Sequence, residues 1–184
     1  MSSCANQPQS LNLLQNNAFS FELLNASDVN FFCTLAEIPG ISLVTTTQAT
    51  RYNQIPHPGE EIRYQDLNVQ FSVDENLKNY FQMHQWIRTS GNAVSLQELY
   101  DEQERVSESG VQFKGTYELG AIYSDAILHI LDAGGKRKNY IKFYNCFPTG
   151  LSSISFDSTT TKTEPISATM SMKYTYYDFF TVPG

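Results

Sequence analysis

The chain has 184 residues, of which 41% are hydrophobic and 17% charged, and its formal net charge is −7. This length suits one compact domain, and the composition excludes an intrinsically disordered chain. The acidic balance has the wrong sign for tight binding to nucleic-acid phosphates, although an acidic wall would let DNA slide past without sticking.

The first part of the chain predicts an arm followed by strands. Residues 1–17 are rich in Asn, Gln and Ser and are expected to form an N-terminal arm, with residues 18–184 as a single domain. Side chains alternate between apolar and polar, as in strands with one buried face, over residues 18–24, 29–37 and 41–47, with a break at Ile38-Pro39-Gly40.

Residues 51–60 contain Pro56, Pro58 and Gly59, and they predict a long exposed loop or the tip of a long hairpin. Alternation resumes over residues 62–73, with a slip of one residue at Asp66 that a β-bulge would explain.

A helix is predicted from Asp74, as N-cap, to about Arg88. Its apolar stripe is expected to pack on the core, together with Trp86, through Leu77, Tyr80, Phe81 and Ile87. A capping-box pattern at Ser95 predicts a possible second, short and acidic helix over residues 96–106.

The last part of the chain predicts more strands. Residues 121–131 and 138–147 flank a hairpin turn at residues 132–136, and strands are also expected at 154–157 and 166–180. The predicted fold is mainly β (α+β): an antiparallel β-sandwich or barrel of about seven or eight strands with one flanking helix.

No motif for chemistry stands out. The three cysteines have no C-x-x-C spacing, the three histidines form no metal motif, and no nucleotide-binding or hydrolase motif is present. The sequence therefore predicts neither an enzyme nor a cofactor or metal site. It also has no stretch that resembles a signal peptide or a membrane anchor.

The order of elements carries a resemblance to a known family. The segments EIPGI (residues 37–41), DLNVQFSVDE (66–75) leading into an aromatic helix, FPTGL (147–151) and MKYTYYDFF (172–180) occur in an order that resembles the tail-tube proteins of contractile-tailed bacteriophages. The family implies a non-enzymatic subunit of the virion tail, assembled in the host cytoplasm. Its hexameric rings stack into the channel through which DNA is ejected.

The resemblance also implies partners: further copies of the chain, tail sheath and baseplate proteins, a tape-measure protein in the lumen, and double-stranded DNA that passes without specific binding. A tube initiator, a baseplate-hub subunit or a tube terminator of the same fold is an alternative. A monomeric carbohydrate-binding β-sandwich is the alternative from another class.

Contacts between subunits are predicted at three places, and the arm and the acidic segment 95–108 are further candidates. The lumen is expected to be lined mainly by polar and acidic residues. The candidate contact residues are Arg51, Tyr52, Asn53, Ile55 and Pro56, then Lys136, Arg137 and Lys138, and finally Tyr177 and Phe179.

Overall fold

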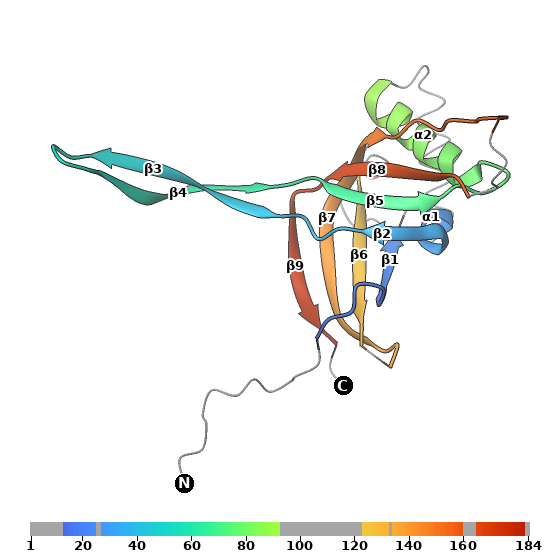
Figure 1. Ribbon diagram of the computed structural model, residues 1–184, viewed down its shortest axis with the longest axis horizontal. Coiled ribbons are helices and arrows are strands. Elements are labelled where there is room, and N and C mark those ends of the chain that lie inside the picture. Colours follow the sequence, from blue (N-terminus) through green and yellow to red (C-terminus); the bar gives the residue numbers. More distant parts are fainter. Residues whose placement is uncertain (1–12, 25–26, 93–122, 133, 160–164, 183–184) are drawn as a thin grey trace, which may run out of the picture.

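The computed structural model (Figure 1) describes residues 13–24, 27–92, 123–132, 134–159 and 165–182. Most of the arm, the predicted second helix and the acidic segment 95–108 lie outside these residues. The elements in chain order are β1 (Phe19–Leu23), α1 (Ser27–Phe32), β2 (Cys33–Ala36), β3 (Ile41–Ala49), β4 (Gln54–Tyr64), β5 (Leu67–Ser72), α2 (Lys78–Asn92), β6 (Ser124–Leu131), β7 (Arg137–Leu151), β8 (Ser167–Lys173) and β9 (Tyr176–Thr181).

The body is a pair of antiparallel layers joined by the long strand β7. The strands are ordered β1-β6-β7-β8-β5-β2, and β9 also pairs with β7. The first part of β7 lies between β6 and β9, whereas its last residues, from Phe147 onward, pair with β8. We call β1, β6, the first part of β7 and β9 sheet A, and the end of β7, β8, β5 and β2 sheet B. The described strands form an open sandwich rather than a closed barrel, and the prediction of a mainly β fold is confirmed.

The core lies between the two sheets, where strand alternation sends every second side chain inward. Leu67, Val69 and Phe71 of β5 face Ala168, Met170 and Met172 of β8 across the same ladder, and all six are buried. Sheet A adds Phe21, Leu23, Ala126, Leu128, Ile141 and Phe143.

The strands β3 and β4 form a separate two-stranded hairpin that projects far from the body (Figure 1). The turn at its tip closes with Thr50 N–H donating to Asn53 O at 2.8 Å. The prediction of a long hairpin here is confirmed, but its tip is shorter than predicted: residues 54–60, with Pro56 and Pro58, lie within β4. Proline is tolerated there because each strand of an isolated hairpin has a free edge.

The helix α2 differs from its prediction in two ways. It begins at Lys78, after a turn in which Leu77 has a φ of 57°, so Asp74 is not its N-cap. Its buried residues are Asn79, Met83, Trp86 and Thr89, whereas Leu77 is 42% and Phe81 63% exposed. The prediction that Leu77 and Phe81 pack on the core is therefore wrong for the single chain. Tyr80 and Ile87, at the border of the buried face, are half-buried.

Four strand predictions also need correction. The alternation over residues 62–73 is divided between β4 and β5, which belong to different sheets, and is not one strand with a bulge at Asp66. Residues 29–37 begin as α1 before β2, and no strand forms at 154–157. The expected strand 166–180 is divided into β8 and β9, because β8 pairs with β5 and the end of β7 whereas β9 pairs with the first part of β7. The break lies at Thr175, whose N–H donates to Tyr144 O at 2.9 Å.

Candidate assembly surfaces

The sheets end in free strand edges. Among the described strands, β1 pairs only with β6, β9 only with β7, and β2 only with β5. Each of these strands therefore presents one row of backbone N–H and C=O groups without a partner strand. Such edges are templates for pairing with another chain.

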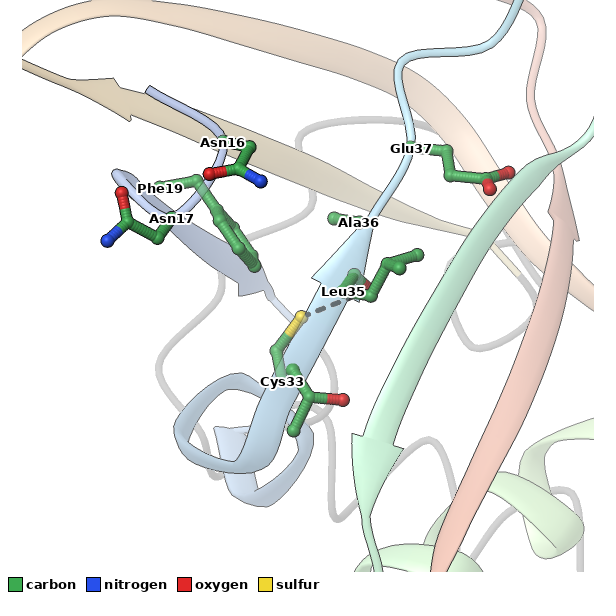
Figure 2. A pocket seen from close by; sticks show the side chains of 8 residues that line it. Asn16, Asn17, Phe19, Cys33, Leu35, Ala36 and Glu37 are labelled. Carbon is green, nitrogen blue, oxygen red and sulfur yellow. Dashed lines mark hydrogen bonds between the residues drawn. The ribbon is translucent and has the colours of Figure 1, made fainter.

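A groove lies between the edge strands β1 and β2 (Figure 2). Its volume is about 630 Å³, and Figure 2 shows Phe19 reaching from β1 toward the side of Cys33 and Ala36. The Cys33 thiol donates to Leu35 O at 3.6 Å, and burial raises the pKa of this thiol to about 11. The thiol thus stays neutral at physiological pH, and the groove offers a largely uncharged wall beside two free edges. It is lined by Asn16, Asn17, Phe19, Cys33, Thr34, Leu35, Ala36 and Glu37.

The β3–β4 hairpin carries exposed apolar side chains, although its two strands pair only with each other. Leu43 lies opposite Ile62 across the ladder, and both are about half exposed, as is Ile41. Near this point the backbones approach so closely that a Cβ on Gly59 would lie 2.4 Å from Val44 O. A two-stranded hairpin alone is marginally stable in water, so this apolar strip favours packing against another chain.

The hairpin tip places one group of predicted contact residues in solvent. Tyr52 is 89% exposed, and the Arg51 guanidinium lies 5.6 Å from the centre of its ring. Asn53, Ile55 and Pro56 are exposed beside them. These residues stay predicted contacts, held at the far end of the molecule.

The basic group at the β6–β7 turn is partly neutralised within the chain. Arg137 Nη2 lies 2.6 Å from Glu22 Oε1 of β1, which ties the turn to an edge strand. Asp132 accepts from the backbone N–H groups of Lys136 and Gly134, and these bonds hold its pKa below the usual range. Lys136, Arg137 and Lys138 are all exposed, but Arg137 is paired with Glu22, so the two lysines are better placed to meet another chain.

The two predicted contacts on β9 differ from each other. Tyr177 is half-buried, packs against Phe143 and donates from its hydroxyl to Pro39 O at 3.2 Å, so it stabilises the subunit itself. Phe179 is 65% exposed. Sequence reasoning also missed some exposed apolar side chains because it assigned them to the core or to a strand. They are Leu77, Phe81, Phe156 and Tyr176.

Other kinds of site receive no support from the parts of the chain that the structure describes. No group of His, Cys, Asp or Glu side chains is arranged to hold a metal ion there. Of the helices in those parts, none has the length and apolar character needed to cross a bilayer.

The described residues thus form a mainly β module with free strand edges and a projecting hairpin. A family model described as phage tail tube protein matches residues 5–180, and the chain belongs to this family. It is a family of structural, non-enzymatic tail components, so the resemblance seen in the sequence is confirmed.

Similar proteins agree with this assignment. The chain is 24% identical over 165 residues to the tail tube terminator protein of Enterobacteria phage T4, covering 88% of this chain and 80% of that protein. The cap of the anti-feeding prophage tube has the same fold, with a TM-score of 0.56, 17% identity and coverage of 99% of this chain and 100% of the other. A chain of the extracellular contractile injection system PVC sheath–tube complex has a TM-score of 0.54, 16% identity and coverage of 98% and 100%.

Proposed function

We propose that this chain is a tail tube terminator, a subunit whose ring closes the end of a phage tail tube. The observation that carries the proposal is the similarity to the T4 tail tube terminator along 80% of that protein. An ordinary tube subunit, which forms many stacked rings, is the second candidate. It is favoured by the family model and by the likeness to a chain of a sheath–tube complex.

Ring closure follows from the free edges. When the subunits form a ring, an edge strand of one copy pairs with an edge strand of the next, and backbone groups that are unpaired in the monomer gain partners. If six copies each give about four strands, the barrel exceeds the roughly 16–18 strands that already leave an aqueous channel in porins. Such a channel admits a DNA duplex.

The hairpin gives the second contact. Its exposed strip around Leu43 and Ile62 is covered when the hairpin packs on a neighbouring copy or on the last ring of the tube. On this model the partners are further copies, the tube, the tail sheath and, through the tube, the baseplate. A tape-measure protein and double-stranded DNA occupy the lumen in turn, and the particle is part of the virion tail assembled in the host cytoplasm.

Negative-stain microscopy of the purified full chain tests the proposal. A terminator forms single or double rings at every concentration, and these rings halt elongation when added to tubes growing from the same phage's tube protein. Long cylinders of this chain alone would instead identify a tube subunit. A monomer at all concentrations that binds sugars would favour the carbohydrate-binding alternative and overturn both.

A further inference from the structure

The two sheets present very different outer faces. On sheet B, the outward side chains of β5, and those of β8 as far as Ser171, are polar and uncharged, and they alternate with the buried core residues. On the edge strand β2, Thr34 is polar, whereas its neighbour Leu35, which pairs with Gln70, is apolar and 42% exposed. This uncharged face consists of Thr34 on β2, Asn68, Gln70 and Ser72 on β5, and Ser167, Thr169 and Ser171 on β8.

The side chains of the uncharged face are held by one another. Gln70 Nε2 donates to Ser167 Oγ at 2.8 Å, and Ser171 Oγ donates to Asn68 Oδ1 at 2.9 Å. Thr34 Oγ1 donates to the Gln70 carbonyl at 3.2 Å. Charged side chains stand only at its margin, where Lys173 Nζ lies 3.1 Å from Asp66 Oδ1 and Asn68 Nδ2 donates to Glu37 Oε2 at 3.3 Å.

The outer face of sheet A is aromatic and ionic. Tyr140 stacks on Phe180 with 5.0 Å between ring centres, and Tyr144 stacks on Tyr176 at 4.5 Å. Between the two stacks, Lys142 Nζ lies 3.0 Å from Asp125 Oδ2. A surface with large rings and cations offers a passing polymer both stacking and phosphate contacts, each of which retains nucleic acid.

The path of the chain connects sheet B with the assembly hairpin. The strand β2 leads into β3 across Glu37–Gly40, and β4 leads into β5 across Gln65–Asp66. In Figure 1 the hairpin leaves the body in line with β2 and β5. A neighbouring copy that packed on the hairpin would therefore meet sheet B before sheet A.

Together these observations lead us to propose that the uncharged face of sheet B lines the channel of the ring and meets the DNA duplex as it passes. This assignment rests on the proposed function. The short side chains leave the bore wide, the amides of Asn68 and Gln70 are engaged by Ser171 and Ser167, and the one lysine at the margin, Lys173, is paired with Asp66. The wall is polar and neutral rather than acidic, and the aromatic face of sheet A points outward.

Size-selective labelling of assembled rings tests the assignment. Thr169→Cys places a thiol on the uncharged face, and Asp178→Cys places the matched thiol on the outer face of sheet A, opposite Lys142. Each variant is assembled, checked for rings by microscopy, and treated with a small maleimide or with a maleimide coupled to a globular protein wider than the bore. The labelling of the unmodified chain, which has cysteines of its own, is subtracted from the labelling of each variant.

The expected result is that Thr169→Cys rings react with the small reagent and are at least tenfold slower with the large one, whereas Asp178→Cys rings accept both. Size selection at Asp178→Cys, at both positions or at neither overturns the assignment while leaving the ring function intact. Absence of rings from the unmodified chain overturns the proposed function itself.

As a second measurement, Thr169→Lys rings should retain duplex DNA at low salt and release it as salt rises. Unchanged retention relative to Asp178→Lys rings would contradict the channel position.

Discussion

At the scale of single residues, α2 shows which of its side chains hold the subunit together. Trp86 is 2% exposed, whereas Phe81 is 63% exposed. We expect Trp86→Ala to lower the free energy of unfolding by about 3–5 kcal/mol, because it leaves a cavity in the core. Phe81→Ala should cost less than about 1 kcal/mol in the dilute monomer. Urea unfolding of both variants measures this, and equal losses would contradict the buried face described for α2.

The second prediction for α2 concerns the buried polar side chain of Asn79. Its side chain is fully buried, donates to Ser72 O at 2.8 Å, and accepts from the N–H groups of Tyr80 and Asp74 at 2.8 and 3.2 Å. Asn79→Ala strands these groups, and we expect a loss of about 2–4 kcal/mol in urea unfolding. Asn79→Asp keeps the acceptor but loses the donor, so it should lie between Ala and the unmodified chain. A neutral Ala variant would show that this bridge from β5 to α2 is dispensable.

The buried thiol of Cys146 gives a pH dependence. Burial raises its pKa from 9.0 in the unfolded chain to about 12. As the pH rises, the thiol therefore loses its proton first in the unfolded chain, which favours unfolding. The protonated Cys146 thiol contributes fully to the free energy of unfolding below pH 9, and this contribution is lost as the pH rises toward 12. By pH 10.5 the loss is roughly 2 kcal/mol. The measurement is the slope of unfolding free energy against pH from 8 to 10.5, which should be shallower in Cys146→Ala. Parallel slopes would contradict it.

At the scale of elements, alternation in the sequence predicted most strands because one face of each is buried. Phe19, Phe21 and Leu23 marked β1, and Asp132 marked the β6–β7 turn. The helix α2 was harder because it has two stripes of large side chains. The stripe with Phe81 looks more apolar than the one with Asn79, yet it is the second that packs on the core. Met83 and Trp86 supply its apolar contacts, and the hydrogen bond from Asn79 to Ser72 satisfies its polar member.

Assembly surfaces could be predicted less well, since exposure depends on which strands meet. Tyr177 and Phe179 are two residues apart on β9 and so lie on the same face of the strand. Tyr177 nevertheless contacts Phe143 and Pro39, whereas Phe179 is exposed to solvent. The division of residues 166–180 between two sheets likewise depends on where β7 changes partners. No local pattern in the sequence shows this.

The hairpin makes the prediction at this scale. The double substitution Leu43→Asp with Ile62→Asp places charges on the exposed apolar strip of the hairpin. Neither side chain belongs to the core of the monomer. We expect monomer stability to change by less than about 1 kcal/mol and ring formation to fall at least tenfold. Ser42→Asp, on the opposite face beside Arg63, is the matched control and should still form rings. Intact rings in the double variant, scored by sedimentation and microscopy, would remove the hairpin from the interface.

At the scale of the whole molecule, the described residues form a folded body with free strand edges and exposed apolar side chains, which the proposed ring would cover. Assembly should therefore add to its stability by mass action, because the ring binds folded chains and not unfolded ones. We expect the thermal midpoint of the unmodified chain to rise with each tenfold increase in protein concentration. The Leu43→Asp and Ile62→Asp double variant should keep one midpoint throughout, while Trp86→Ala should keep the concentration dependence at a lower midpoint. A midpoint of the unmodified chain that ignores concentration, measured by scanning calorimetry across the range in which rings appear, would mean that its edges gain nothing from neighbouring copies.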